Sequence, residues 1–159
     1  MSFRIRDIAL PEEKAAALAF IEGSQHYEHD VEPNRRLDDA VAAEHFALLR
    51  ERMATNRGRI FVAELDGRVV GWAVFFVEQH PVFVTEDQRT YGYIAELFVE
   101  EHTRSHGVGR ALIGSCETEA RRLGLGHIMI GVLASNTRAA DVYTRAGYTP
   151  YSSELRKFL

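Results

Sequence analysis

The sequence predicts an α/β fold: a mixed, mostly antiparallel sheet with one central parallel strand pair, flanked by helices. The antiparallel part follows from two stretches rich in β-branched and aromatic residues, 59–65 and 68–77, which Asp66-Gly67 separates. An Asp-Gly pair tolerates the positive φ angles of a tight hairpin turn. The parallel pair follows from a later strand–helix–strand order, because a crossover helix brings successive strands into parallel alignment.

The N-terminal part is expected to begin with a strand and two helices. Residues 3–6 alternate apolar and charged side chains, as a short strand does. Pro11 suits the first turn of a helix, and the glutamates after it suit the positive end of the helix dipole. We expect this alanine-rich helix to end near Gly23. Apolar residues at helical spacing predict a second helix over residues 34–56.

The C-terminal part is expected to alternate strands and helices. The apolar run at residues 91–99 predicts a strand buried on both faces. The helical period returns over residues 107–123. A strand at residues 127–133 precedes a short helix at residues 137–146, which has capping side chains just before it. The tail up to residue 159 alternates weakly and predicts a last strand or two.

Composition excludes several classes of protein. The 159 residues suit one domain, and the 46% apolar content excludes a disordered chain. A net charge of −4 argues against a general nucleic-acid surface, and a single cysteine excludes an internal disulfide. No apolar run approaches the roughly 20 residues of a membrane span, and the charged start does not resemble a signal peptide. We therefore expect a cytoplasmic protein with neither a nucleic-acid nor a membrane partner.

An anion-binding pattern lies where the strand at residues 91–99 passes into the next helix. Gly107 and Gly109 start that helix, and residues 102–110 hold two Arg and two His but no acid. The first-turn amides of a helix have no intrahelical partner, and the helix dipole adds about half a positive charge there. Glycine also lets an anion approach the backbone closely. This chemistry suits a pyrophosphate.

Other glycine-loop motifs fail at specific positions. A G-x-G-x-x-G dinucleotide fingerprint needs glycine at position 112, which is Leu112. A phosphate loop ending in G-K-S/T is absent, because Arg110 and Ala111 follow the second glycine. A helix that starts with two glycines and binds nothing remains the simplest alternative.

The motifs around this loop occur in a recognisable order. An L-x-V strand leads to R-x-x-G-x-G, and N-x-x-A-x-x-x-Y-x-x-x-G-Y follows after a helix and a strand. This order resembles the GNAT superfamily of acyl-CoA-dependent N-acetyltransferases over residues 91–150, and the preceding hairpin and helices extend the resemblance to nearly the whole chain. Two positions depart from the common pattern, namely Glu101 in place of Pro and Ser105 in place of Gly. The matching residues are Leu97, Val99, Arg104, Gly107, Gly109, Asn136, Ala139 or Ala140, Tyr143, Gly147 and Tyr148.

The resemblance implies that residues 1–159 form a single N-acetyltransferase domain that uses acetyl-CoA as co-substrate and no metal. It implies that strand backbone groups bind the pantetheine arm, and that a bulge there directs an amide at the thioester carbonyl. It further implies that Asn136 contacts the cofactor arm and that Tyr143 protonates the departing thiolate. The strand residues concerned are Leu97, Phe98 and Val99, and the amides that cradle the pyrophosphate belong to Arg104, Ser105, His106, Gly107, Val108 and Gly109.

A general base is needed if the acceptor is an alkylamine. Its pKa near 10.4 lies about 3.4 units above neutrality, so forming the free amine costs roughly 4.6 kcal/mol at pH 7. Glu96 is the one carboxylate inside the apolar strand run and is our candidate. A direct proton transfer to an ordinary Glu is uphill by about six units, which favours a relay or a raised pKa. The alternative for Glu96 is an ion pair with an Arg or a position facing solvent.

Tyr143 also has a structural alternative. A Tyr with a pKa near 10 can protonate a thiolate at a cost of about 2 kcal/mol, because a thiol has a pKa near 8.5. An aromatic ring at this position could instead fill a gap between helix and sheet.

The acceptor site is expected in an acidic, aromatic segment. Residues 15–34 contain no Lys or Arg, and Tyr27, Glu28 and Asp30 lie among further acids and histidines. A loop of this kind suits a cationic amine, either a small molecule or a peptide, although a solvated loop would have the same composition.

Other candidate sites carry less information. The pairs His26 with His29 and His102 with His106 have spacings that could bind a metal, but no third ligand is evident, so no metal is expected. Cys116 is expected to be a core residue, as is Trp72.

Two functions compete with an acetyltransferase. One is a CoA-binding regulatory module without turnover, and the other is a nucleotide or phosphate binder that uses the same glycine loop. The sequence leaves the acceptor, the acyl chain and the oligomeric state open, a homodimer included.

Overall fold

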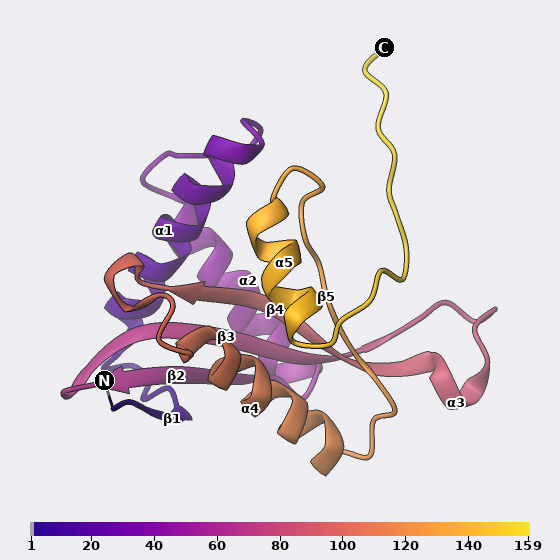
Figure 1. Cartoon of the computed structure of the whole chain (residues 1–159), viewed down its shortest axis with the longest axis horizontal. Helices are drawn as coiled ribbons and strands as arrows, with labels where there is room; N and C mark the ends of the chain where they lie inside the picture. The colour runs from indigo at the N-terminus through magenta and orange to yellow at the C-terminus, as the bar shows by residue number, and fades with distance from the viewer. Residues whose placement is uncertain (1) are drawn as a thin grey trace.

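A five-stranded mixed sheet organises the computed structural model, which describes residues 2–159. The strands lie in the order β1-β2-β3-β4-β5, and only β4 and β5 run parallel. The predicted α/β class is confirmed, but the parallel pair lies at one side of the sheet rather than at its centre. The strands are β1 (Arg4–Asp7), β2 (Arg59–Leu65), β3 (Arg68–Gln79), β4 (Thr90–Val99) and β5 (Ile128–Ile130) (Figure 1).

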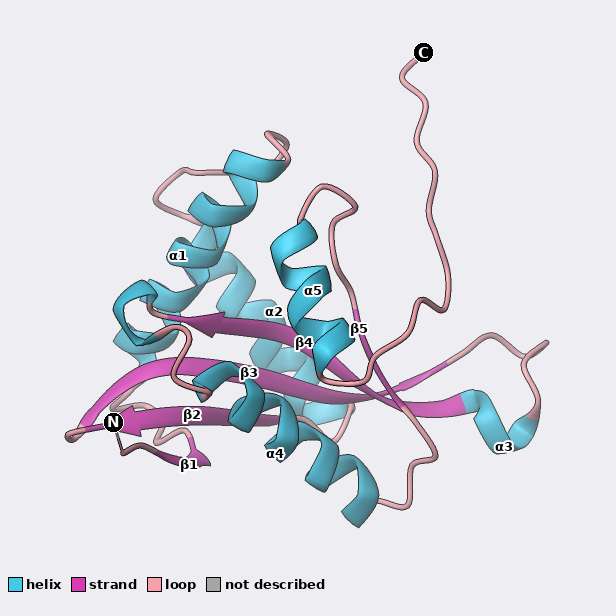
Figure 2. Cartoon of the chain, in the orientation of Figure 1, coloured by secondary structure: helices cyan, strands magenta, loops and turns pink. Residues whose placement is uncertain are grey.

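Helices cover both faces of this sheet (Figure 2). α1 and α2 pack against one face, and α4 packs against the other. α5 follows β5, and a short α3 precedes β4. The helices are α1 (Lys14–Val31), α2 (Val41–Thr55), α3 (Glu86–Arg89), α4 (Val108–Arg122) and α5 (Thr137–Arg145), and a single 3₁₀ turn covers Glu101–Thr103.

Side-chain alternation along β3 divides the core into two clusters. Trp72 and Val74 pack with α1 and α2, whereas Ala73 and Phe75 pack with α4. Successive strand residues point to opposite faces of a sheet, so a central strand can supply both cores. Trp72 and Cys116 are fully buried, which confirms their assignment to the core.

The hairpin at Asp66-Gly67 forms as predicted. Asp66 has a φ of 49° and Gly67 a φ of 78°, so both central residues of the turn adopt positive angles. The turn joins β2 to β3 in an antiparallel pair with Leu65 opposite Arg68. The composition of the two flanking stretches and the turn chemistry were sufficient to place this part of the sheet.

α1 is longer than predicted, because Gly23 does not end it. The helix continues to Val31. A Cβ atom at position 23 would lie 2.6 Å from Cζ of Phe98, so this glycine allows α1 to approach β4 closely. The acidic, aromatic segment expected as a loop therefore forms the last turns of a helix, and its side chains point in several directions.

α2 begins later than predicted, at Val41 instead of residue 34. The Asp38 side chain accepts a hydrogen bond from the backbone N–H of Ala40 at 3.1 Å and pairs with Arg36. Asp favours such local side-chain-to-backbone bonds over a helical interior, so the segment before Val41 remains a loop.

The C-terminal part differs most from the prediction. β5 contains only Ile128–Ile130 instead of residues 127–133, and residues 149–159 form no strand. β5 pairs with β4 only from Gly92 to Ile94. Only Gly92 and Ile94 of β4 are fully buried, so the expected burial on both faces is wrong for most of the strand. Beyond Ile94 the two strands are no longer paired and separate into a wedge.

Candidate active site

A β-bulge lies in β4 at the point where the wedge opens. Glu96 pairs with Val74 of β3, but Ile94 pairs with Phe75, so Ala95 is an extra residue without its own partner. A bulge bends a strand and changes the direction of the neighbouring side chains and amides. This one directly precedes Glu96, next to the L-x-V run.

The two candidate catalytic side chains line one small cavity in the wedge. Its volume is about 70 Å³, and α1, β4, β5 and α5 all contribute to its wall. Glu96 reaches it from β4 and Tyr143 from α5. The other side chains that carry polar groups to it belong to Ser24, Glu28 and Tyr93.

Glu96 is hydrogen-bonded to His45 of α2. The distance from Oε1 of Glu96 to Nε2 of His45 is 2.5 Å, and the two residues are 51 positions apart in the sequence. The Glu96 side chain is 16% exposed and that of His45 39% exposed, so the pair extends from the cavity toward solvent. The hydrogen bond to Glu96 raises the pKa of His45 above its usual value. No local pattern predicts this contact, because His45 lies at one of the helically spaced positions of α2 and Glu96 lies in a distant strand.

Burial changes the chemistry of Tyr143. Loss of solvation raises the pKa of its phenol to about 12, so the group keeps its proton throughout the neutral range. The equilibrium cost of giving that proton to a thiolate rises to about 5 kcal/mol, because the two pKa values differ by about 3.5 units. Tyr143 is therefore better suited to donating a strong hydrogen bond to the negative charge that develops on the sulfur than to transferring its proton completely.

The loop before α4 presents a row of free backbone donors. Among the described residues, the backbone amides of residues 105–110 have no hydrogen-bond partner. Ser105 has a φ of 67° and Gly107 a φ of 83°, which gives the loop its curvature. No atom would lie within 4 Å of a Cβ on Gly107, and only a Val99 methyl at 3.7 Å would be near one on Gly109. The space in front of these amides is open, which fits an anionic group at the helix start.

Arg104 fixes this loop to the end of β4. Its Nε donates a hydrogen bond to the carbonyl oxygen of Val99 at 2.9 Å. Its guanidinium lies 5.7 Å from the ring centroid of Tyr27 and 5.8 Å from that of Phe98. Arg104 thus acts through packing and a backbone contact as well as through its charge.

Asn136 connects α5 to α1. Its Oδ1 caps α5 by accepting the backbone N–H of Ala139 at 3.1 Å and also accepts the hydroxyl of Tyr27 at 3.2 Å. The predicted capping role is confirmed. Because Oδ1 is engaged twice, the amide Nδ2 is the group of Asn136 that can serve a ligand.

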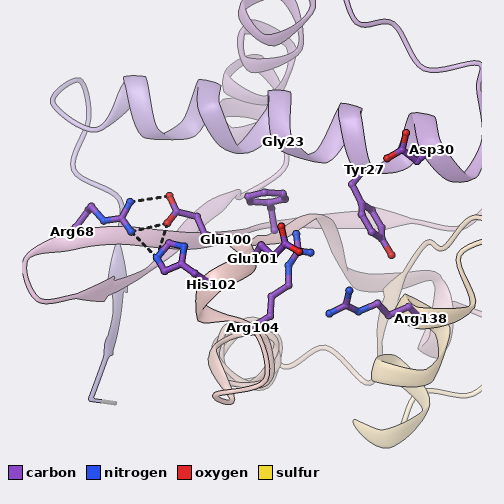
Figure 3. Close-up of a pocket in the computed structure, with 10 residues that line it drawn as sticks. Gly23, Tyr27, Asp30, Arg68, Glu100, Glu101, His102, Arg104 and Arg138 are labelled. Carbon is purple, nitrogen blue, oxygen red and sulfur yellow. Dashed lines mark hydrogen bonds and ion pairs between the residues drawn. The ribbon is translucent and has the colours of Figure 1, made fainter.

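A larger cavity of about 660 Å³ adjoins the loop (Figure 3). Tyr27 and Asp30 reach it from α1, Arg104 from the loop and Arg138 from α5. On its far side Arg68 pairs with Glu100 at 2.8 Å. The cavity therefore has the basic side chains of Arg104 and Arg138 near the loop, whereas Arg68 is held by Glu100.

The three expected acceptor residues do not share one site. Glu28 lines the small cavity with Glu96 and Tyr143, whereas Tyr27 and Asp30 line the larger one. Helical geometry explains the division, since residues three apart lie on one face and the residue between them points elsewhere. Glu28 also pairs with Arg35 at 2.6 Å.

Within residues 2–159 there is no group of three or more His, Cys, Asp or Glu side chains that could hold a metal ion. None of the helices in this part of the chain is long and apolar enough to cross a membrane.

Comparison with known proteins gives one consistent family. The sequence model described as "Acetyltransferase (GNAT) family" matches residues 17–148. An uncharacterized N-acetyltransferase, YhfO, of Bacillus subtilis (strain 168) is 26% identical over 114 residues, which cover 72% of each chain.

Solved structures share the fold. A predicted acetyltransferase of Clostridium acetobutylicum, crystallised with acetyl-CoA, has a TM-score of 0.76 and 18% identity, covering 99% of this chain and 96% of the other. An aminoglycoside acetyltransferase, meta-AAC0020, from an uncultured soil metagenomic sample has a TM-score of 0.70 and 19% identity, covering 99% and 95%. At these identities the structures establish the fold alone.

Proposed function

Because the chain belongs to the GNAT acetyltransferase family, it is an acyltransferase, and we propose that it moves the acetyl group of acetyl-CoA to a primary amine by direct attack in a ternary complex. One observation carries the proposal. Glu96 and Tyr143, from different elements, line a single small cavity at the point where β4 and β5 separate. A base for the amine and a hydrogen-bond donor for the departing sulfur are the groups that this transfer needs.

The cofactor is proposed to lie along the open edge of β4 and over the start of α4. The amides of residues 105–110 would hold the pyrophosphate, and Gly107 and Gly109 leave room for it. The backbone of Leu97 to Val99, which β5 does not pair, would bind the pantetheine arm together with Nδ2 of Asn136. This route ends at the small cavity, where the acetyl group would meet the acceptor.

The reaction assigns different tasks to the residues around the cavity. The acceptor ammonium loses a proton toward Glu96, directly or through water, and the free amine attacks the thioester carbonyl. Main-chain donors at the bulge are suited to stabilise the oxyanion, because a bulge frees amides from the sheet ladder. Tyr143 donates a hydrogen bond to the departing sulfur. No covalent enzyme intermediate is required, and burial raises the pKa of Cys116 to about 12, which suppresses its nucleophilic form.

The acceptor is proposed to be a small cationic amine. Glu28 and Glu96 supply two carboxylates to the cavity wall, and an ammonium group is attracted to such an environment. The fold is shared with an enzyme whose name describes acetylation of aminoglycosides, which are polyamines. A peptide amine remains the alternative, with the open larger cavity as the space for its chain.

Release of free thiol from acetyl-CoA tests the proposal. The panel should contain polyamines, aminoglycosides, amino sugars, amino acids and short peptides. We expect amine-dependent release that falls strongly in Glu96→Gln, while acetyl-CoA binding measured by calorimetry stays close to that of the parent. Binding without amine-dependent release from any class would instead support a regulatory CoA-binding module.

A further inference from the structure

We propose that His45 is a positioning residue that accepts, through Glu96, the proton lost by the acceptor amine. The inference rests on the proposed function and adds to it a residue of α2 that lies outside the cavity lining. Its basis is the 2.5 Å contact between Nε2 of His45 and Oε1 of Glu96. Only one carboxylate oxygen of Glu96 takes part, so the other remains available to the acceptor.

Glu96 alone is a poor final acceptor of this proton. An alkylammonium with a pKa near 10.4 and a carboxylic acid near 4.3 differ by about six units, which corresponds to roughly 8 kcal/mol. An imidazole with a pKa of 6.5 or higher reduces that difference to less than about four units, or about 5 kcal/mol. The His45–Glu96 pair therefore behaves as a stronger base than the carboxylate by itself.

The different exposure of the two side chains indicates that the proton moves from Glu96 to His45 and then to solvent. Glu96 is mostly buried at the cavity, whereas His45 is more than one-third exposed. Among the described residues, the His45 ring has no hydrogen-bond partner other than Glu96. The ring can therefore exchange protons with solvent while the carboxylate faces the substrate.

The proton balance is complete without another reagent. The acceptor ammonium gives one proton to the free oxygen of Glu96, and the electron pair left on nitrogen forms the new bond to the carbonyl carbon. When the adduct collapses, the C–S bond breaks with its electron pair on sulfur, and the second N–H proton goes to the departing thiolate. With the proton of neutral His45 on Nδ1, the carboxyl group turns the accepted proton toward Nε2, which takes it and leaves an ionised Glu96 hydrogen-bonded to an imidazolium. The imidazolium then loses a proton to water, and the neutral ring is restored for the next turnover.

The surroundings of His45 act on its charged form in opposite directions. Glu96 on β4 has the largest effect and raises the pKa of His45, and Glu28 on α1 acts in the same direction. Desolvation and Arg52, about two turns further along α2, lower it. His45 must be neutral to accept a proton, so turnover should increase as pH rises through its pKa.

His45→Gln is the informative variant. The glutamine amide can still donate a hydrogen bond to Glu96 and hold it in place, but it cannot accept a proton. His80→Gln is a matched control, since His80 precedes α3 and contacts His127 and Tyr91 rather than the cavity. Ethylamine and 2,2,2-trifluoroethylamine serve as probes of similar size, because the fluorines make the second amine largely neutral at pH 8.

We expect kcat with ethylamine to fall about 10- to 100-fold in His45→Gln. With trifluoroethylamine the loss should be below about threefold, because little or no proton has to be removed before attack. The limb of the kcat–pH profile that rises above about pH 6.5 should also disappear. An equal loss with both amines, or an unchanged profile, would mean that His45 only supports the structure and would overturn the proposal.

An NMR titration gives a readout that does not depend on turnover. The His45 ring should titrate above about 6.5 in the parent and closer to 6.5 in Glu96→Gln. An unchanged His45 pKa in Glu96→Gln would show that the pair does not form in solution, and the proposal would fail. Failure of the proposed function looks different, since a protein with an intact pair would then bind acetyl-CoA and release no thiol with any amine.

Discussion

At the scale of single residues, the ring and the hydroxyl of Tyr143 have roles that two variants can distinguish. The ring packs with Tyr148, at a centroid distance of 6.3 Å, and belongs to the margin of the core beneath α4. Tyr143→Phe keeps this packing and removes only the donor. If the hydroxyl stabilises the leaving sulfur, kcat should fall about 10²- to 10⁴-fold with little change in KM for acetyl-CoA, because the interaction matters mainly in the transition state.

The contrast with Tyr143→Ala completes this prediction. Loss of the ring should lower the unfolding midpoint, whereas Tyr143→Phe should unfold close to the parent. Steady-state kinetics with chemistry shown to be rate-limiting, together with thermal unfolding of both variants, provide the measurement. Nearly normal turnover in Tyr143→Phe would leave this residue with a packing role alone.

A second prediction at this scale links the His45–Glu96 pair to stability. The folded pKa of His45 is raised by Glu96, so the pair stabilises the native state below the unfolded value of about 6.5. This contribution disappears as pH rises through the folded pKa of His45. The difference in free energy of unfolding between the parent and Glu96→Gln should therefore be larger at pH 5.5 than at pH 9, as urea titrations would show. A difference that grows with pH contradicts this assignment.

At the scale of elements, the loop before α4 separates the effects of backbone and side chain. Gly109 has open space around it, so Gly109→Val should change stability little and yet obstruct an anion at the helix start. Arg104→Ala removes an anchor but leaves the amides. We expect calorimetry to show a larger loss of CoA affinity in Gly109→Val than in Arg104→Ala. The opposite order would mean that the side chain, not the amide cradle, provides most of the binding.

Two helical glycines make a matched pair for the packing of α1. Glycine to alanine in an unhindered helix interior stabilises by about 1 kcal/mol, and Gly114 of α4 has no atom within 4 Å of a Cβ position. At Gly23 the new methyl would collide with the Phe98 ring. We expect Gly114→Ala to raise the unfolding free energy by about 1 kcal/mol and Gly23→Ala to lower it by about 1–3 kcal/mol. Stabilisation in both variants would show that Phe98 moves aside freely.

These elements also show what the sequence could and could not predict. Local chemistry was sufficient at Asp66-Gly67, at Asn136 and at the start of α4, because turn angles and caps depend on a few neighbouring residues. It failed at Gly23, where a glycine needed for close packing looks the same as a helix stop. The Glu96–His45 contact joins positions 51 apart, and no local pattern contains such information.

The end of β5 was mispredicted for a related reason. Residues 131–133 are apolar enough for a strand, but pairing with β4 stops at Ile94. A strand-like sequence pattern reflects the preference of the side chains for a sheet surface. It does not indicate whether a neighbouring strand is available for pairing. The same separation of β4 and β5 forms the wedge on which the proposed function depends, so the least predictable stretch of the sheet is also the one next to the site.

At the scale of the whole molecule, each ligand should stabilise the fold by an amount that increases with its affinity, and the affinity should increase with the number of ligand groups that the protein contacts. A ligand present at one hundred times its dissociation constant adds about 2.7 kcal/mol to the free energy of unfolding. If the pantetheine arm lies along the open edge of β4, CoA should bind more tightly than a nucleotide that carries the same phosphates without the arm. At equal concentrations, CoA should then give the larger increase in Tm.

Thermal unfolding with acetyl-CoA, CoA and adenosine 3′-phosphate 5′-diphosphate, which keeps the pyrophosphate and lacks the pantetheine arm, measures this difference. Gly109→Val should reduce the response to all three, because each presents phosphates to the same amides. A substitution in the wedge, Asn136→Ala, should reduce the response to CoA more than the response to the arm-free nucleotide, since only a ligand with the pantetheine arm reaches that residue. It also removes a cap worth about 1 kcal/mol, so each response is compared with that of the unliganded variant. Equal stabilisation by CoA and the arm-free nucleotide would place all binding energy at the helix start, as expected for a phosphate binder and not for an acetyltransferase.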